Sequence, residues 1–445
     1  MFFHPYVLLN SFRFPYLGGW LVVHEGFFQI GIFVLIYPGM KKYIFWFLML
    51  FPLIVSAGGF QLNSLSPGTA AMGGGVTGFA LDASAAYFNP AALAKLQGNT
   101  LTAGVALQVP LTVFSSPYGK IEEMGSSAFA SPFLYGSYRL SKKTVIGLSV
   151  NSPYGYNSNW KDDWSGRYVS ISSRLNSTYI QPSLSYQLGK NIFIGAGPVL
   201  AFSSIKAMRL LDLSSSSLGD ARLQTEGGAA GFGFNAGLLA SFGKTMLGIN
   251  YRSAVNFLEE DGEAAFMNIP SLLVQDGIFP TVTTFKSEWS LPSVLSVGLS
   301  RSVDEKVTLA LDFSTTGWSV YDSVNIGFSD YPQLNQNKPR KYTNSFSLRG
   351  GVQYVYSPKI TFRGGLAYET SPVPDGYVIP ETADAGRFLF AGGCTLMLKK
   401  SWSIDVALMI ENMQERLETD NVVEDFNGNY KTIIYGAVLG IQKAF

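Results

Sequence analysis

The chain has 445 residues, with 32 basic and 31 acidic side chains, two histidines and one cysteine. This balanced charge provides no basic field for nucleic acid, and the lone Cys394 can form neither an intrachain disulfide nor a thiolate metal cluster. Charged residues make up only 14% of the chain, against roughly 25% in soluble domains, whereas aromatic residues reach 14% and glycines number 47. The composition is typical of a membrane protein and excludes a nucleic-acid-binding one.

Residues 40–57 have the three parts of a secretory signal peptide. Met40-Lys41-Lys42 supplies positive charge, Tyr43–Val55 carries no charge, and Val55-Ser56-Ala57 is a small-residue cleavage site. The uncharged stretch is too short for a membrane-spanning helix, which needs ~20 residues. We therefore expect export and removal of residues 1–57.

Residues 1–39 precede this signal, although a signal peptide normally starts the chain. We interpret them as sequence upstream of the true start, Met40; the alternative is an uncleaved N-terminal anchor that includes the apolar run 27–38. Both histidines, His4 and His24, fall in this part. Without them no Ser-His-Asp triad, His-ligated zinc or His general base can form, so we expect no enzyme activity, no metal and no cofactor.

After residue 100 apolar and polar side chains alternate, as Ile180, Leu184 and Leu188 do with Gln181 and Ser185. Such alternation predicts half-buried β-strands, and no uncharged apolar run beyond Ala57 is long enough for a membrane-spanning helix. An even strand number is typical of bacterial outer-membrane barrels. We expect fourteen strands, near 100–110, 132–140, 144–152, 178–188, 191–200, 232–241, 245–253, 293–301, 306–314, 345–355, 360–368, 387–398, 402–410 and 431–445.

The connections between these segments alternate between short and long. Tight turns such as 141–143, 189–190 and 243–244 often carry lysine. The alternating connections are long: 111–131, 153–177, 201–231, 254–292, 315–344, 369–386 and 411–430. Short turns on one side and long loops on the other are typical of an outer-membrane barrel, whereas nothing in a soluble β-sandwich forces this alternation.

The last expected strand ends at the C-terminal residue Phe445. A terminal aromatic residue on an amphipathic final strand fits the signal that the barrel-assembly machinery reads, so we expect that machinery to be a partner during biogenesis.

Residues 58–99 lie between the signal and the first strand, and they are rich in apolar residues such as Phe60, Leu62 and Phe88. A barrel of this width leaves an aqueous lumen unless something fills it. We expect an N-terminal hatch or plug over 58–99 and a barrel over 100–445; the alternative is a flexible periplasmic arm.

Short motifs run in order along most of the chain. They are Gly59-Phe60-Gln61-Leu62-Asn63, Asn89-Pro90-Ala91, Trp164-Ser165-Gly166-Arg167-Tyr168, Gly231-Phe232-Gly233-Phe234-Asn235, Tyr251-Arg252-Ser253 and Ser371-Pro372-Val373-Pro374-Asp375 with Arg387-Phe388. They resemble the FadL/TodX family of outer-membrane transporters for long-chain fatty acids and other hydrophobic compounds. The resemblance implies an all-β, membrane-spanning, 14-stranded antiparallel β-barrel plugged by a small N-terminal hatch, with a groove between outer loops and a deeper pocket.

The resemblance also suggests gating residues. Asn89, Pro90 and Ala91 match the hatch motif, although Asn before Pro is also an ordinary helix start. Phe60 lies near the mature N-terminus, which in the family reaches toward the pocket; the alternative is packing of the hatch against the wall. Pro153, Tyr154 and Gly155 interrupt a strand and are candidates for a lateral opening, unless the strand simply ends there.

The third and fourth long loops expose many apolar side chains, which usually mark a binding surface. Our ligand-binding candidates there are Leu210, Leu211, Phe266, Met267, Leu272, Leu273 and Phe279. The alternative is packing of the loops on one another as a lid. A buried ligand carboxylate needs a cation, for which Arg209 and Lys341 are candidates; each could equally form an ordinary loop or lumen salt bridge.

These features favour passive, ligand-gated uptake of long-chain fatty acids or other hydrophobic molecules through the bacterial outer membrane, by a monomer surrounded by outer-membrane lipid. A general porin for polar solutes, a structural or adhesive barrel, and an outer-membrane enzyme are the alternatives. The sequence does not choose among hydrophobic substrates, because an apolar pocket discriminates by only ~1–3 kcal/mol per methylene.

Overall fold

The computed structural model describes residues 19–24, 27–32, 58–125, 128–213 and 219–445. It divides into two units, 1–54 and 55–445. In the first, β1 (Gly19–His24) and β2 (Phe27–Ile32) form an antiparallel pair. The expected signal peptide 40–57, its cleavage site and His4 lie outside the described residues.

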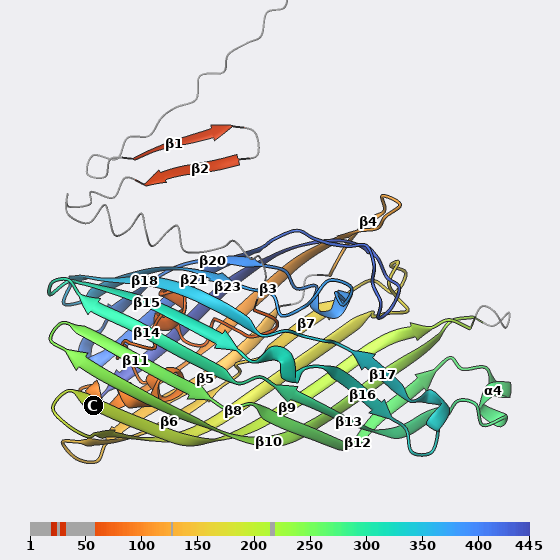
Figure 1. The fold of residues 1–445 in the computed structure, drawn as a ribbon, viewed down its shortest axis with the longest axis horizontal. Helices are drawn as coiled ribbons and strands as arrows, with labels where there is room; N and C mark the ends of the chain where they lie inside the picture. Colours follow the sequence, from red (N-terminus) through yellow and green to blue (C-terminus); the bar gives the residue numbers. More distant parts are fainter. Residues whose placement is uncertain (1–18, 25–26, 33–57, 126–127, 214–218) are drawn as a thin grey trace, which may run out of the picture. The chain divides into compact units, whose positions relative to one another are not determined.

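The second unit contains a closed antiparallel barrel whose first and last strands pair along their whole length (Figure 1). The fourteen expected strands are confirmed. They are β3 (Thr100–Ser115), β5 (Phe129–Arg139), β6 (Thr144–Asn151), β8 (Ser172–Gln187), β9 (Ile192–Leu211), β10 (Ala221–Phe242), β11 (Thr245–Arg252), β14 (Val294–Ser302), β15 (Val307–Thr316), β18 (Ser345–Ser357), β19 (Ile360–Glu369), β20 (Arg387–Met397), β21 (Trp402–Met413) and β23 (Gly428–Ala444). Among the described residues, no helix combines the length and apolar character needed to cross a membrane.

The long connections contain more strand than the sequence suggested. β9 and β10 stay paired from Ile192 and Ala240 out to Leu211 and Ala221, so most of the expected loop 201–231 is a β-hairpin that extends the wall. The expected loop 254–292 folds as a second hairpin. Shorter elements complete this end of the barrel: β4 (Ile121–Glu123), β7 (Gly155–Asn159), β12 (Val255–Met267), α4 (Ser271–Gln275), β13 (Val282–Leu291), η3 (Trp318–Val320), β16 (Ser323–Gly327), η4 (Pro332–Leu334), β17 (Gln336–Pro339), η5 (Pro380–Thr382), η6 (Lys399–Ser401) and β22 (Arg416–Glu418).

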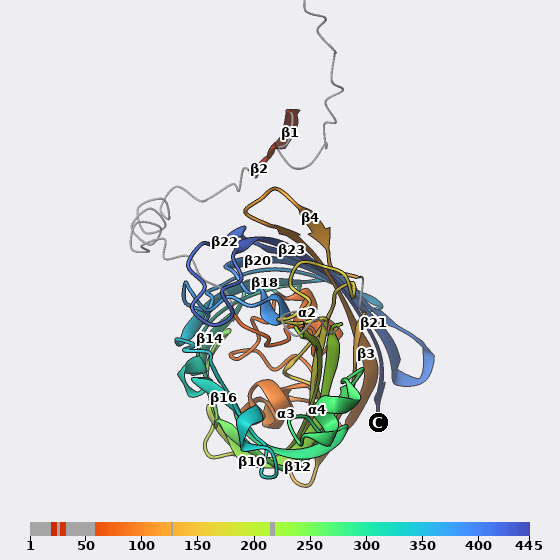
Figure 2. The ribbon, with the colours of Figure 1, turned by 90° about the vertical axis from the view of Figure 1, so that its right-hand side faces the viewer.

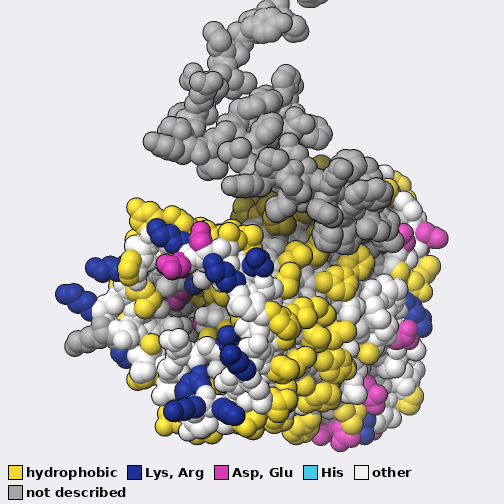
Figure 3. Space-filling model, turned by 60° about the vertical axis from the view of Figure 1, so that its left-hand side comes forward, with side chains coloured by type: hydrophobic (Ala, Val, Ile, Leu, Met, Phe, Trp, Pro, Cys, Tyr) yellow, Lys and Arg dark blue, Asp and Glu magenta, His cyan; other side chains and the backbone are white. Residues whose placement is uncertain are grey.

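The outer surface of the wall is apolar. Leu101, Leu107 and Leu111 on β3 and Leu295 and Leu299 on β14 are all exposed, as the alternation of a lipid-facing strand requires. Figure 3 shows the apolar band, with Lys and Arg side chains gathered at one end of the barrel. The short turns carry exposed lysines, among them Lys142, Lys143, Lys190, Lys244 and Lys359.

Residues 58–99 lie inside the barrel (Figure 2) and contain α2 (Pro67–Ala71), α3 (Ala85–Phe88) and η1 (Pro90–Lys95). We call this segment the N-terminal plug. It lies close to the wall because glycines face it: a Cβ on Gly195 would meet Pro90, and one on Gly237 would meet Asn89 Oδ1. Further wall glycines touching the plug are Gly147, Gly248, Gly298, Gly351, Gly365 and Gly393.

Candidate functional site

A cavity of about 120 Å³ lies between the start of the plug and the barrel wall. We call it the inner cavity. One part of its lining is apolar, with Phe60, Leu62, Met124, Phe129 and Ile434. The remainder is polar, and its charged members are Glu381, Asp384, Arg387 and Glu411. The inner cavity therefore offers an apolar compartment next to a charged wall.

Phe60, near the start of the plug, forms the centre of an aromatic cluster. Its ring centroid lies 4.6 Å from that of Trp318, 5.6 Å from those of Tyr156 and Tyr321, and 6.5 Å from that of Tyr154, all in edge-on geometry. Such pairs contribute about 0.5–1.5 kcal/mol each beyond burial of area. Phe60 is buried and lines the inner cavity, so the structure brings together both roles considered for it, wall packing and access to the cavity.

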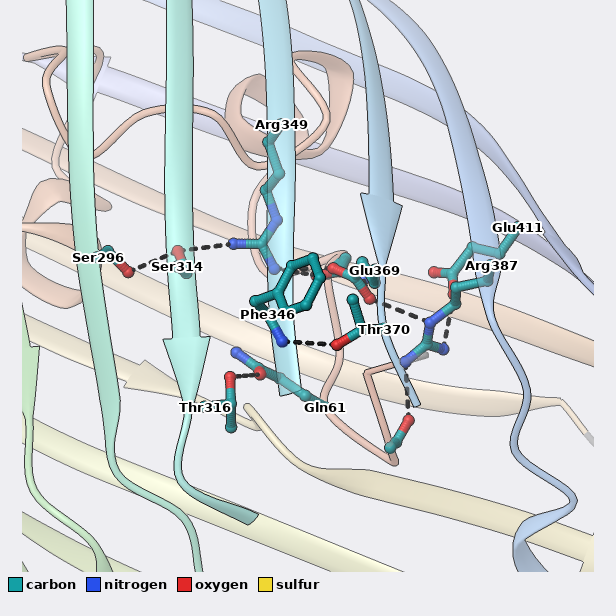
Figure 4. A network of polar contacts seen from close by, with 12 residues as sticks. Gln61, Ser296, Ser314, Thr316, Phe346, Arg349, Glu369, Thr370, Arg387 and Glu411 are labelled. Carbon is teal, nitrogen blue, oxygen red and sulfur yellow. Dashed lines mark hydrogen bonds and ion pairs between the residues drawn. The ribbon is translucent and has the colours of Figure 1, made fainter. Parts of the chain in front are cut away.

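A network of buried charges ties the first plug residues to the wall (Figure 4). Arg387 on β20 donates from Nε to Glu369 and from Nη1 to Glu411, both at 3.0 Å, and from Nη2 to the Gly59 carbonyl at 2.8 Å. Arg349 on β18 donates to Glu369 at 2.8 Å and to Asn63 Oδ1 at 3.3 Å. Removing one partner of such a buried ion pair typically costs about 3–5 kcal/mol of stability. This network therefore holds the first residues of the plug in place.

The members of this network are hard to recognise from the sequence alone. In the sequence, Arg387 stands out only as part of a motif, and nothing marks Glu369 as the partner of Arg349. Glu411 and Asp384 had no distinguishing signal, because isolated acidic residues in a loop or at a strand end are common on exposed surfaces. Only the closure of the barrel shows that they are buried.

A second cavity of about 80 Å³ lies nearer the long-loop end. We call it the outer cavity. Its apolar lining includes Ile205, Leu223, Phe285 and Trp289. Three basic side chains and one acidic side chain also line it: Arg209, Lys338, Arg340 and Glu381. Two of these cations are ion-paired, Arg340 with Glu381 at 3.3 Å and Lys338 with Glu424 at 3.1 Å, so the chamber combines an apolar wall with basic side chains along its lining.

Of the two cations predicted to contact a ligand, Arg209 lines the outer cavity, whereas Lys341 lines neither cavity. The Lys341 side chain is half exposed and pairs with Asp322 at 2.9 Å. Its neighbour Arg340 takes the inward position and pairs with Glu381 at 3.3 Å. The pKa of Arg340 is raised above its ordinary value: burial lowers it, but the Glu381 carboxylate and nearby tyrosines act in the opposite direction and outweigh burial.

Tyr156 and Glu381 line both cavities. The boundary between the two chambers therefore consists of an aromatic ring and one half of an ion pair. Both are side chains on connections between membrane strands, where small rotations cost less than a change in the wall itself.

The apolar loop candidates pack mainly on one another. Phe266 is buried in a cluster with Leu223, Phe285 and Phe328, and Phe279 and Leu211 pack against it. Leu210 and Leu273 are half-buried, while Met267 and Leu272 are exposed. Of this cluster, Leu223 and Phe285 line the outer cavity. None of the predicted apolar loop residues lines either cavity; Phe266, Phe279 and Leu211 instead pack behind the outer cavity wall.

The wall is interrupted where Pro153, Tyr154 and Gly155 were expected to break a strand. The ladder between β5 and β6 stops at Leu134–Val150, and the following β7 pairs only with β8 among the described strands. The plug bonds to the break instead: Leu62 donates to the Pro153 carbonyl at 2.9 Å and Gly155 donates to the Phe60 carbonyl at 3.1 Å. Phe129 and Gly155, on the two sides of the interruption, both line the inner cavity.

Asn89 joins plug and wall. Its Oδ1 accepts from Ala91 N–H at 3.1 Å and caps η1, while its Nδ2 donates to the carbonyls of Thr77 at 2.8 Å and Leu238 at 3.1 Å. Pro90 and Ala91 are buried against β9. The motif therefore does more than start a helix, because its amide also bonds to β10.

Similarity to known proteins extends over most of the chain. Residues 48–442 match the family model described as "Outer membrane protein transport protein (OMPP1/FadL/TodX)". The "Long-chain fatty acid transport protein" of Escherichia coli K12 is 26% identical over 396 residues, covering 79% of this chain and 86% of the relative.

Solved structures show the same fold. The crystal structure of a Pseudomonas aeruginosa FadL homologue has a TM-score of 0.78 at 18% identity, and covers 87% of this chain and 100% of the other. The Ralstonia pickettii toluene transporter TbuX has a TM-score of 0.68 at 20% identity, with the same two coverages. At these identities the likeness concerns the fold alone.

Proposed function

Because this chain belongs to the OMPP1/FadL/TodX family of outer-membrane transport proteins, we propose that it takes up long-chain fatty acids or other hydrophobic molecules across the outer membrane by passive, ligand-gated diffusion. The observation that supports this proposal is the pair of adjoining cavities inside the closed barrel, with basic side chains along the lining of the outer one. An apolar solute that is slowed by the polar face of the membrane gains two apolar binding steps along this route.

In this proposal the outer cavity binds the ligand first. Arg209 and Arg340 meet an anionic headgroup when one is present, and the apolar walls accept the chain. Movement of Tyr156 and of the Arg340–Glu381 pair then opens the inner cavity. The ligand leaves through the interruption at Pro153–Gly155, between β5 and β7, when the backbone bonds to Phe60 and Leu62 open.

The plug is the proposed gate toward the periplasm, with Asn89, Pro90 and Ala91 as its anchor on β9 and β10. We further propose that residues 1–57 are removed on export, that the barrel-assembly machinery recognises the strand ending in Phe445, and that the mature protein is a monomer in outer-membrane lipid. No cofactor is needed, since flux follows the concentration gradient.

A general porin or structural barrel is the competing function. The buried plug and its charge network oppose a porin, because they occupy the lumen through which polar solutes would pass. The wall interruption beside an apolar cavity opposes a purely structural barrel, which has no use for it.

The test is ligand binding by the protein purified from the outer membrane. Saturable binding of radiolabelled stearate, displaced by an alkane, by an aromatic hydrocarbon or by both, is expected, and the displacement pattern identifies the substrate class. Absence of saturable binding for all three probes overturns the proposal. Ion conductance in planar bilayers provides a second readout: low conductance is expected with the plug in place, and large open channels would support the porin.

A further inference from the structure

Gly58, the first described residue of the barrel unit, lies in a buried, acid-rich position. A Cβ built on it would lie 2.6 Å from Glu369 Oε2 and 2.9 Å from Arg387 Nη2. Both backbone polar groups of Gly59 are hydrogen-bonded. Its N–H donates to Asp384 Oδ2 at 3.3 Å, and its carbonyl accepts from Arg387. A side chain at Gly58 would displace these two charged groups, so in the glycine the backbone itself lies next to them.

The charges around Gly58 do not balance. Three buried carboxylates, of Glu369, Asp384 and Glu411, face two guanidiniums, of Arg349 and Arg387. Glu369 and Glu411 are each paired with a guanidinium, whereas Asp384 has no ion pair among the described residues. Its Oδ2 accepts from Ser371 Oγ at 2.7 Å, but its buried Oδ1 has no hydrogen-bond partner there. Asp384 therefore has no cation within ion-pair distance, although Arg387 and Arg416 lie close enough to act on its charge.

The neighbouring cations have other carboxylates as their ion-pair partners. Arg340 pairs with Glu381 at 3.3 Å, and Arg416 pairs with Asp375 at 2.8 Å. A buried charge without a partner is costly, and burial indeed raises the pKa of the Asp384 carboxyl above its usual range. The cluster therefore calls for one more cation beside Gly58.

Proteolytic processing creates such a cation at this place. Hydrolysis of the Ala57–Gly58 bond by a signal peptidase consumes one water, leaves a carboxylate on Ala57 and gives Gly58 an α-ammonium with three donors. We propose that this ammonium is the missing cation: it pairs with Asp384 and Glu369 and anchors the mature N-terminus beside the inner cavity. The inference rests on the export and processing proposed above.

The consequence is that processing completes the site. The ammonium sits one residue before Gly59 and two before Phe60, which both line the inner cavity. Before cleavage the same position holds a neutral amide and the acid excess persists. After cleavage the ammonium balances the charge of the carboxylates. The start of the plug, which bonds to the Pro153–Gly155 interruption, is then anchored at its N-terminal residue.

The first test is the chemistry of the amine. Intact-mass analysis of protein purified from the outer membrane is expected to show a chain starting at Gly58. An ordinary α-amine has a pKa of about 7.7–8.0, so at pH 7.5 a rise of one unit reduces the reactive neutral form about six- to eightfold and a rise of two units about sixtyfold or more. We therefore expect acetylation of Gly58 at pH 7.5 to be at least about tenfold slower in the folded barrel than after heat unfolding. A different N-terminal residue, or equal rates, overturns the inference.

The second test moves the charge. Insertion of one alanine after Ala57 shifts the ammonium away from Asp384, and Asp384→Asn removes its partner; Asp330→Asn, at an exposed loop position, is the matched control. We expect the insertion to lower the thermal midpoint and expose the N-terminal segment to protease in the wild type, but to add little in Asp384→Asn. Additive effects in the double variant would refute the pairing.

Folding and function are separated by independent readouts. Heat-modifiable gel mobility reports barrel formation, and if Asp384→Asn fails to fold, the amine protection of the wild type still decides the question. Stearate binding is measured on the same samples. A protected amine without stearate binding would overturn the proposed function but not this inference. Stearate binding with an unprotected amine would overturn this inference but not the proposed function.

Discussion

Arg340 and Glu381 form a 3.3 Å ion pair at the boundary between the two cavities. Both side chains are largely buried, and Glu381 lines both chambers while Arg340 lines only the outer one. The pair places a cation toward the long-loop end and an anion toward the plug. A charged ligand moving inward would therefore meet the positive Arg340 first and the negative Glu381 second.

Substitution of this pair should affect anionic and neutral ligands differently. A hydrogen bond to a charged group contributes about 1.5–3 kcal/mol, so Arg340→Gln is expected to weaken laurate binding by roughly tenfold or more while leaving dodecane binding nearly unchanged. Equilibrium binding to the purified protein measures both. Lys341→Gln is the control, because its exposed pair with Asp322 lies outside the cavities. Equal losses for both ligands would exclude a role in recognising charge.

Glu381→Gln should act in the opposite direction on laurate. Removal of the internal counterion leaves the Arg340 guanidinium for the ligand carboxylate, so laurate binding is expected to tighten even though loss of a buried pair costs stability. The thermal midpoint and the laurate affinity, measured together, separate the two effects. Weaker laurate binding by a folded Glu381→Gln variant would show that Glu381 does not compete with the ligand carboxylate for Arg340.

Phe60→Ala should both destabilise the protein and weaken binding. Truncation of a buried phenylalanine typically costs about 3–5 kcal/mol, and four aromatic contacts are lost in this case. Denaturant unfolding in detergent measures the first effect and stearate binding the second. Tyr118→Ala is the control, because that side chain is 97% exposed. A variant with normal stability and binding would show that the aromatic cluster is dispensable.

Gly237→Ala tests whether the plug closes the lumen. The new Cβ would meet Asn89 Oδ1, and overpacking costs about 1–3 kcal/mol, enough to raise the fraction of displaced plugs by roughly tenfold. Single-channel conductance in planar bilayers is expected to rise. Gly350→Ala provides the matched control, since a Cβ there meets nothing within 4 Å. Equal conductance in both variants would argue against a closing role for the plug.

Acid should loosen one outer loop contact. Partial burial acts to raise the pKa of Glu122, but Lys120 at 2.6 Å and two hydrogen bonds from Ser165 N–H outweigh it, so the pKa of Glu122 lies below its ordinary value. The contact is therefore present above the ordinary glutamate pKa and is lost as pH falls through the lowered one. Hydrogen exchange at Ser165 should accelerate at low pH, and at neutral pH in Glu122→Gln. Unchanged exchange in both cases would contradict this.

The sequence by itself determined the barrel, because strand alternation and turn chemistry are local. Period-two patterns such as Ile180–Leu188 report which side chains face lipid, and short turns such as Gly243-Lys244 report where strands reverse. Asn89 could be recognised for a similar reason, since its capping contact reaches only to Ala91.

Only the tertiary structure decided the site. Gly59 and Asp384 are 325 residues apart in sequence, and Arg349 meets Asn63 across a comparable separation. Whether Arg340 or Lys341 faces the cavity depends on how β17 and its neighbours pack, which no local pattern encodes. The charges are buried because the closed wall removes them from water, and that closure joins β3 to β23, the first and last strands of the barrel.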